Sequence, residues 1–192
     1  KVLENSYRAT NIAFIEEWGR FAADVGVDLF EIIEAIRYRP THNNIKQPGF
    51  GVGGYCLPKD PLLPSVSYRE FFPLKDNEFP FSRMAVEINN KMPLASLRKI
   101  KTLLGETLIN KRILLFGVSY RSDIGDTRFS PAQIFVEAAI KEGAEVDCYD
   151  PLIRHWDEMG MSLPESLPSA NGYDAAVFAL SHEEFLNMDI PK

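Results

Sequence analysis

Hydrophobic residues in the first half of the chain recur at the spacing of amphipathic helices. Apolar positions three and four residues apart predict a helix over residues 2–25, which Gly26 should end. Asp28, with Glu31 three residues later, is typical of the start of a capped helix, and Pro40 should end this second helix. The chain therefore opens with two predicted helices in succession.

Two further helices are predicted, and irregular segments separate them. A long loop should cover residues 38–58, and a weaker helix 61–70. Residues 73–80 are expected to be a linker, followed by a long helix over 82–104 that Pro93 should kink or split. No strand pattern appears in this half, so we expect it to be all-helical.

The second half alternates strand and helix patterns. The apolar run 111–118 fits a buried parallel strand, and further strands are predicted at 145–149 and 174–180. A helix over 130–142 lies between the first two, with a Ser-Pro start that favours a capped N-terminus. This order predicts a doubly wound α/β sheet. The whole chain thus reads as a helical domain over 1–105 followed by an α/β domain over 106–192.

Composition and charge exclude several classes of protein. The chain has 192 residues, of which 45% are hydrophobic and 25% charged, as in ordinary globular proteins rather than disordered ones. Residues 1–105 carry a net charge of +2 and residues 106–192 a net charge of −8. Such an acidic surface would repel nucleic acid, so we exclude nucleic-acid binding as a main function. No apolar run is long enough for a membrane helix.

The chain contains two cysteines, Cys56 and Cys148, too few for a disulfide scaffold. No signal peptide is visible, which makes the cytoplasm the expected compartment. Cys148 falls in a predicted strand and should be buried. The chain begins at Lys1 directly on a helical pattern, so we expect it to be a fragment of a longer protein.

The segment GFGVGGYCLPKD, residues 49–60, is the strongest candidate for chemistry. Its glycines would allow a backbone to approach a ligand closely. Lys59 would favour the thiolate of Cys56, and Asp60 could orient water. A structural cysteine in a flexible loop explains the spacing about equally well. The pattern is not a dinucleotide fingerprint, because no strand precedes it, and no zinc-site spacing occurs.

Two other segments carry weaker signals. Lys1 and Asn5 lie one helical turn apart and could stabilise an oxyanion together, although a solvated helix end is the simpler interpretation. The segment 120–131 follows the first strand, at the sheet edge where such folds bind ligands. Its arginines could bind phosphate, or could pair with neighbouring aspartates.

Together these segments resemble the UDP-glucose/GDP-mannose dehydrogenase family of nucleotide-sugar 6-dehydrogenases. That family has a Lys-x-x-x-Asn helix, a GxGGxCxxxD loop and a G-x-x-[FY]-[KR]-x-D-x-x-D-x-R-x-S-P segment. The corresponding stretches here are Lys1–Asn5, Gly51–Asp60 and Gly117–Pro131, in the same order. The resemblance covers essentially the whole chain.

The resemblance implies a reaction and a set of residues. Family members oxidise the C6 alcohol of a nucleotide sugar to a carboxylate with two NAD⁺, through a thiohemiacetal and a thioester on a cysteine. The implied catalytic residues are Cys56, Lys1, Asn5 and Asp60. The implied substrate contacts are Gln47, Gly49, Phe50, Gly51 and Gly53 in the loop, and Tyr120 and Arg121. Arg128 and Lys59 are the implied NAD contacts, and no metal is expected.

The resemblance also implies the missing parts and the partners. The family's N-terminal NAD-binding Rossmann domain has no counterpart here, and the C-terminal domain looks incomplete at its end. We therefore expect the isolated chain to be inactive. A homodimer through the helices at 2–25 and 82–104 is expected, as is a UDP-sugar substrate.

Details of sequence favour a UDP-N-acetylhexosamine dehydrogenase, acting on UDP-N-acetylmannosamine or UDP-N-acetylglucosamine. The usual His-Pro-Arg before the loop is absent, so either His42 or Arg39 would replace its cross-subunit arginine. A UDP-glucose or GDP-mannose dehydrogenase remains an alternative. An alternative of another class is a non-catalytic nucleotide-binding or dimerisation module.

Overall fold

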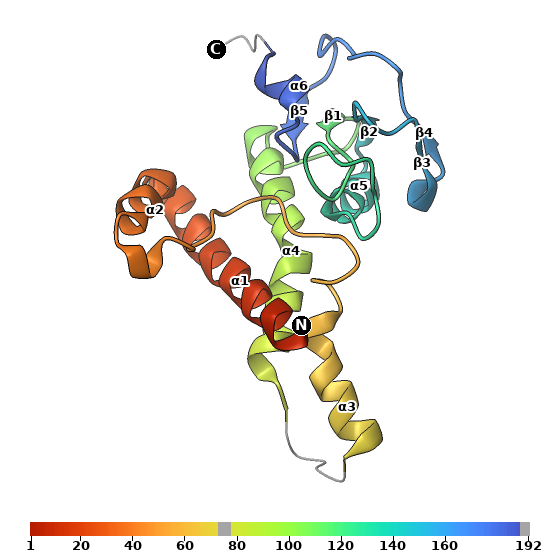
Figure 1. Ribbon diagram of the computed structural model, residues 1–192. Coiled ribbons are helices and arrows are strands. Elements are labelled where there is room, and N and C mark those ends of the chain that lie inside the picture. The colour runs from red at the N-terminus through yellow and green to blue at the C-terminus, as the bar shows by residue number, and fades with distance from the viewer. Residues whose placement is uncertain (73–77, 189–192) are drawn as a thin grey trace. The chain divides into compact units, whose positions relative to one another are not determined.

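The computed structural model describes residues 1–72 and 78–188 and falls into two compact units (Figure 1). One unit holds residues 1–51 and 55–92, and the other holds residues 52–54 and the chain from 93 onward. The predicted linker at 73–80 lies mostly outside the described residues. The contacts divide the chain at Pro93, whereas the sequence pattern predicts a domain boundary after residue 105. The assignment of functional domains to 1–105 and 106–192 stays a prediction.

The first two helices are as the sequence predicts. α1 spans Val2–Val25 and ends at Gly26, whose left-handed backbone (φ 73°, ψ 31°) only glycine adopts without strain. α2 spans Leu29–Arg37, and its cap Asp28 accepts hydrogen bonds from the backbone of the first helical turn. A short 3₁₀ helix, η1 (Pro40–His42), follows.

Only part of the recurring apolar pattern of α1 faces inward. The helix packs through Ala9 and Ala13 against Ala85 of the same unit. Trp18 and Val25, which also belong to the apolar pattern, are 49% and 53% exposed. Apolar side chains occupy more than one face of this helix, so their spacing predicted the helix but not which face points inward.

A second 3₁₀ helix, η2 (Asp60–Leu62), leads into α3 (Leu63–Phe71), and α4 covers Pro80–Leu103. α4 runs through Pro93 without interruption, so the predicted split is wrong. Proline removes a single backbone donor from the helix, and the neighbouring Met92 is buried. Met84, which shares the apolar spacing of this helix, is 47% exposed.

The second unit contains the predicted parallel sheet. β1 (Arg112–Phe116) lies between β2 (Glu145–Tyr149) and β5 (Ala175–Phe178), and both neighbours run parallel to it. α5 (Pro131–Lys141) connects β1 to β2 and packs against β2 (Figure 1). The fold class predicted from the sequence, a helical part followed by a Rossmann-like parallel sheet, is therefore confirmed.

Both faces of β1 are covered, which explains its unbroken apolar run. Leu114 and Phe116 pack with Phe185 of α6 (Glu183–Leu186), and Ile113 and Leu115 on the opposite face are fully buried. The carboxyl ends of β1 and β2 therefore meet at one edge of a well-packed sheet.

Four small elements of this unit were not predicted. They are β3 (His155–Trp156), η3 (Asp157–Met159), β4 (Met161–Ser162) and the single-turn helix α6. Strands of two residues are too short to show alternation in the sequence. Over residues 1–72 and 78–188, no helix combines the length and the hydropathy needed to cross a membrane.

Candidate active site

Cys56 lies in a tight backbone turn at the end of the glycine-rich loop. Its carbonyl oxygen accepts hydrogen bonds from the backbone N–H groups of Lys59, at 3.2 Å, and Asp60, at 2.8 Å. The turn keeps Cys56 exposed and places the lysine and the aspartate beside it. An accessible thiol next to a cation and a carboxylate has the setting of a nucleophile.

The Asp60 side chain is buried and held from both sides. Its Oδ2 accepts a hydrogen bond from Asn5 Nδ2 at 2.7 Å, and its Oδ1 lies 3.0 Å from Lys59 Nζ. The hydrogen bond from Lys59, then that from Asn5, and the charge of Lys1 lower the pKa of Asp60 below its usual range. Asp60 is therefore a fixed carboxylate.

Lys59 connects this carboxylate to the cysteine. Its ammonium lies 4.7 Å from the centre of the Tyr55 ring, and its hydrogen bond to Asp60 raises the pKa of the lysine. The charges of Asp60, Tyr55 and Cys56 contribute further to this rise. Lys59 thus belongs to the group around Cys56, and its expected contact with NAD stays a prediction.

The two helix residues behave differently from each other. Asn5 is only 1% exposed, so it is not part of a solvated helix end. Lys1 is exposed and lies 3.5 Å from Glu4. The structure therefore brings Asn5, Cys56, Lys59 and Asp60 together, and Lys1 acts on Asp60 through its charge.

The first part of the glycine loop lies against α1. A Cβ at Gly19 would stand 2.6 Å from Pro48, so α1 and the loop touch at this point. Glu16, one turn earlier, is buried and accepts a hydrogen bond from the Gly49 backbone. Burial raises the pKa of Glu16 to about 7, against the opposing effects of Arg20 and that hydrogen bond.

Glu16 was not singled out in the sequence. Glu16 shares a helix face with Ala9 and Ala13, which are buried. This helical spacing is the sequence signal that could have indicated a buried carboxyl group. Of the other loop residues expected to bind substrate, Gln47 and Gly49 are exposed, and Phe50 and Gly51 are half-buried.

In the second unit, the end of the glycine loop touches the segment after β1. The Gly54 backbone donates to the Arg128 carbonyl at 2.9 Å. A Cβ at Gly53 would lie 2.3 Å from the Phe129 carbonyl oxygen and 2.8 Å from Tyr120 Cβ, so only glycine fits there. The structure thus joins Gly53 to Tyr120 and to the backbone preceding α5.

The arginines of this segment have different environments. Arg128 makes a close pair with Asp126, with Nη2 2.6 Å from Oδ2, which lowers the pKa of Asp126. Arg121 is exposed. Asp123 approaches His182 rather than an arginine. The sequence left open whether these arginines bind phosphate or pair with neighbouring aspartates. The structure shows that Arg128 pairs with an aspartate.

Two models of one protein family match the chain. The central domain of the UDP-glucose/GDP-mannose dehydrogenase family matches residues 1–91, and the UDP binding domain of the same family matches residues 114–192. The chain belongs to the UDP-glucose/GDP-mannose dehydrogenase family. The resemblance seen in the sequence motifs is thereby confirmed.

Several members of the family are similar over nearly the whole chain. The UDP-N-acetyl-D-mannosamine dehydrogenase of Methanocaldococcus jannaschii is 36% identical over 98% of this chain and 41% of its own length. The structure of the UDP-D-ManNAc dehydrogenase of Pyrococcus horikoshii is 33% identical, with a TM-score of 0.80, over 98% of this chain and 43% of its own. The chain thus spans less than half the length of these relatives.

A third comparison concerns the fold alone. The UDP-glucose dehydrogenase structure from Pyrobaculum islandicum has a TM-score of 0.85 at 21% identity, over 100% of this chain and 44% of its own. The helical unit and the parallel sheet of this chain thus have the architecture of the family.

NAD is the cofactor that the family implies. The Arg128 side chain is 62% exposed, but Asp126 already balances its charge. The Lys59 ammonium is 45% exposed and is balanced by Asp60 in the same way. A contact of either residue with the phosphates of NAD stays a prediction. Within the described ranges, no group of His, Cys, Asp and Glu side chains could hold a metal ion.

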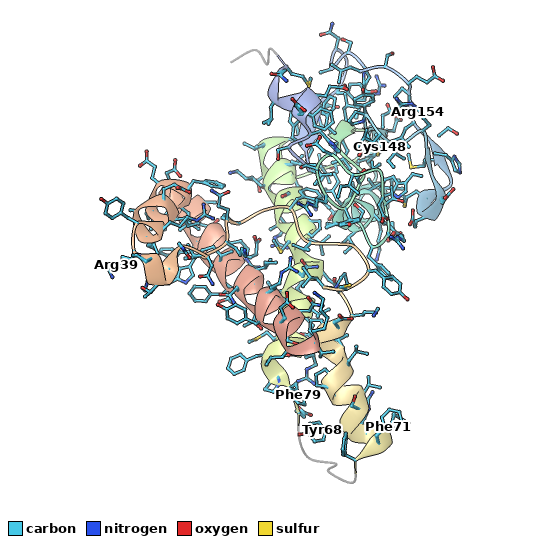
Figure 2. The ribbon with its side chains drawn as sticks, viewed as in Figure 1. Arg39, Tyr68, Phe71, Phe79, Cys148 and Arg154 are labelled. Atoms are coloured by element: carbon cyan, nitrogen blue, oxygen red, sulfur yellow. The ribbon has the colours of Figure 1, made fainter. Side chains whose placement is uncertain are left out.

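The remaining candidates lie apart from these groups. Cys148 is buried in β2, as expected, and burial, with a contribution from Asp147, raises the pKa of its thiol to about 12. His42 is exposed and lies beside Thr41, and Arg39 is exposed beyond the end of α2 (Figure 2). A cross-subunit role for either residue stays a prediction.

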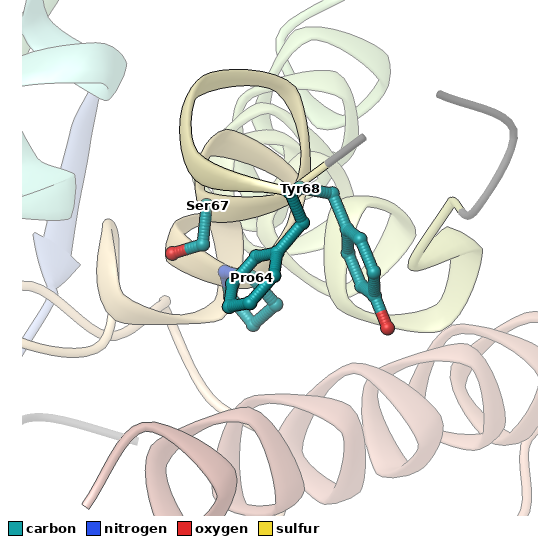
Figure 3. A pocket seen from close by; sticks show the side chains of 4 residues that line it. Pro64, Ser67 and Tyr68 are labelled. Atoms are coloured by element: carbon teal, nitrogen blue, oxygen red, sulfur yellow. The ribbon is translucent and has the colours of Figure 1, made fainter. Parts of the chain in front are cut away.

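A pocket of about 320 Å³ opens on α3 (Figure 3). Pro64, Ser67, Tyr68 and Phe72 line it, and the Tyr68 ring also lies 5.4 Å from that of Phe79. None of the predicted site residues lines this pocket, whose lining combines two aromatic side chains with a proline and a serine.

Proposed function

We propose that the full-length protein oxidises the C6 alcohol of a UDP-N-acetylhexosamine to a carboxylate, with Cys56 as the nucleophile and NAD⁺ as the oxidant. The observation that carries the proposal is the Cys56 turn: an exposed thiol directly beside a carboxylate that Asn5 and Lys59 hold in place. Membership of a family of nucleotide-sugar dehydrogenases supports it.

The residues of this chain have distinct parts in the proposed reaction. The Cys56 thiolate adds to the C6 aldehyde and forms a thiohemiacetal, whose oxidation yields a thioester. When bound, NAD⁺ would supply the oxidant by taking up the hydride released from C6 in the oxidation of the alcohol and again in that of the thiohemiacetal, with Arg128 and Lys59 as the residues proposed to hold it. Asp60, kept ionised by Lys59 and Asn5, orients the water that hydrolyses the thioester. Lys1 supplies positive charge near the developing oxyanion.

The substrate proposal rests on the relatives. The most similar ones reported above are named for UDP-N-acetyl-D-mannosamine, so we place this sugar first and UDP-N-acetylglucosamine second. Tyr120, Arg121 and the loop 47–53 are proposed to bind the nucleotide sugar. UDP-glucose and GDP-mannose remain the alternatives. We place the enzyme in the cytoplasm, where NAD⁺ and nucleotide sugars are available.

The catalytic role of Cys56 is tested by Cys56→Ser in the full-length protein. A serine hydroxyl is a far weaker nucleophile at neutral pH, so NADH formation from UDP-N-acetylmannosamine should fall by about 10³-fold or more. The matched control is Cys148→Ala, which removes the buried thiol and should leave the rate within about twofold. Unchanged dehydrogenation in Cys56→Ser would overturn the covalent mechanism.

The nucleotide class is tested separately, by thermal shift with UDP, both UDP-N-acetylhexosamines, UDP-glucose and GDP-mannose. A ligand that binds only the folded state raises the melting temperature. UDP compounds should produce a shift and GDP-mannose should not. Binding of UDP without any dehydrogenation would favour the non-catalytic nucleotide-binding module.

A further inference from the structure

A buried ionisable pair lies at the carboxyl edge of the sheet in the second unit. Asp150 directly follows β2, His182 precedes α6, and both side chains are completely buried. His182 Nε2 lies 3.3 Å from Asp150 Oδ2. The function proposed above uses neither residue, so their burial together needs another explanation.

Asp150 is bonded to the start of the segment that follows β1. Its Oδ2 accepts hydrogen bonds from the backbone N–H groups of Val118, at 2.9 Å, and Ser119, at 3.0 Å, and from Ser119 Oγ at 2.9 Å. Its Oδ1 accepts one from the Leu152 backbone at 2.9 Å. The carboxylate is thus fully satisfied, and it fixes the direction in which the chain leaves β1.

His182 holds the same segment a few residues later. Its Nδ1 accepts a hydrogen bond from the Asp123 backbone N–H at 3.0 Å. Because this nitrogen accepts, the neutral imidazole carries its proton on Nε2, which lies close to Asp150 Oδ2 but makes no hydrogen bond to it. The Phe185 ring packs edge-on against the imidazole, with centroids 5.1 Å apart. His182 therefore holds the Asp123 turn through Nδ1 and lies against the buried carboxylate through Nε2.

The turn that His182 holds is conformationally strained. Asp123 has a φ of 59°, a region that non-glycine residues rarely occupy. Two further hydrogen bonds hold it: the Glu183 backbone donates to Asp123 Oδ1 at 3.1 Å, and the Ser181 backbone donates to Ser122 Oγ at 3.2 Å. The turn directly follows Tyr120 and Arg121, so its position determines theirs.

We propose that His182, backed by Asp150, is a positioning residue that sets the affinity of the Tyr120–Arg121 segment for the nucleotide. The proposal rests on the function proposed above, which assigns this segment to the UDP-sugar. His182 does not touch the ligand. It acts by accepting a hydrogen bond from the Asp123 backbone N–H. Loss of this hydrogen bond would release the turn from its strained conformation.

Two amide variants separate the contacts of His182. In His182→Asn the amide oxygen takes the place of Nδ1 and can still accept from Asp123. In His182→Gln the amide reaches the place of Nε2, and the Asp123 N–H loses its acceptor. Both variants put a neutral amide in the same buried site, so a general loss of packing affects them alike.

The measurement is UDP binding to the full-length protein by calorimetry, followed by kinetics with the UDP-sugar. We expect the Kd for UDP to rise about tenfold in His182→Gln and less than about threefold in His182→Asn. KM should follow Kd while kcat changes little, because the reacting groups are untouched. The control is His155→Gln, at an exposed position of the same unit, which should leave Kd unchanged.

The outcomes are distinct. Equal UDP affinity in the two amide variants, or a change in kcat without a change in KM, would overturn the positioning role. If the wild-type protein bound no UDP at all, the proposed function itself would fail, and the inference with it. Wild-type binding with the expected order of variants supports both.

Discussion

At the scale of single residues, the structure shows two uses of a buried carboxyl group. Asp60 keeps its charge because Lys59 and Asn5 compensate it. Glu16 has less compensation, and burial raises its pKa to about 7. Buried groups of the same chemical type thus differ in charge at neutral pH, and the difference comes from the neighbours that the fold provides.

The state of Glu16 leads to a pH-dependent prediction. The folded protein holds this proton up to about pH 7, whereas the unfolded chain releases it near 4.5. Between these values the folded state binds more protons, so the contribution of Glu16 to stability falls as the pH rises. Glu16→Gln, whose amide can still accept from Gly49, should therefore be more stable than wild type above about pH 7, by on the order of 2 kcal/mol.

Urea denaturation at about pH 8 and about pH 4.5 checks this prediction. The gain in the free energy of unfolding should nearly vanish at the lower pH, where the folded state carries the proton and the unfolded state carries it about half of the time. Glu17→Gln, an exposed neighbour on the same helix, is the control and should show no such gain. A gain of equal size at both pH values would contradict the assignment.

At the scale of elements, helix starts were among the most predictable features. Asp28 and Ser130 both cap the helices that the sequence assigned to them. The Ser130-x-x-Gln133 spacing also predicts a reciprocal bond from Gln133 to the cap, and this prediction is wrong, since the Gln133 amide donates to Glu137 at 2.8 Å instead. An N-cap depends on neighbouring residues alone, whereas a long side chain also has exposed partners along its own helix.

Ser130 also makes a tertiary contact, so replacing this residue should have a measurable effect on the free energy of unfolding. Its hydroxyl accepts from the Ala132 backbone and donates to the Ser119 carbonyl, both at 3.2 Å, and the residue is 2% exposed. Ser130→Ala should lower the free energy of unfolding by about 1–2 kcal/mol, because both groups lose a buried partner. Chemical denaturation measures it, with the exposed Ser166→Ala as control, and a loss no larger than the control's would refute it.

At the scale of the whole molecule, α1 presents a face of large apolar side chains without cover. Its members are Leu3, Tyr7, Phe14, Trp18, Phe21 and Val25, each at least 49% exposed. They recur at intervals of three, four and seven along the helix, so they lie on one side of it. An exposed apolar face of this kind is typical of a protein interface, which agrees with the predicted homodimer.

The dimer prediction is tested by Phe14→Asp combined with Phe21→Asp. Charges on this face would have to be buried unpaired in an interface through α1, so light scattering should show a monomer where wild type is a dimer. Leu152→Asp combined with Leu186→Asp, at exposed apolar positions of the second unit, is the control and should stay dimeric. A wild-type monomer would overturn the prediction.

Local sequence patterns were enough to give the order of the longer helices and strands, the caps of two helices and the strand whose two faces are covered. They also determined which residues carry the family motifs. These features follow from local rules of spacing, backbone conformation and turn chemistry, which act within a few residues of one another. Cys148 lies in the edge strand β2, and the alternation of exposed and buried positions along that strand places it on the buried face.

Features that depend on distant segments could not be read from local patterns and follow from the packing of the folded chain. Asn5 and Asp60 are 55 positions apart, and their hydrogen bond makes one a buried anchor and the other a fixed carboxylate. The continuity of α4 through Pro93, the exposed face of α1 and the pairing of His182 with Asp150 are of the same kind. Each depends on which groups the fold packs together, and burial and hydrogen bonding then set the charge and position of the side chain.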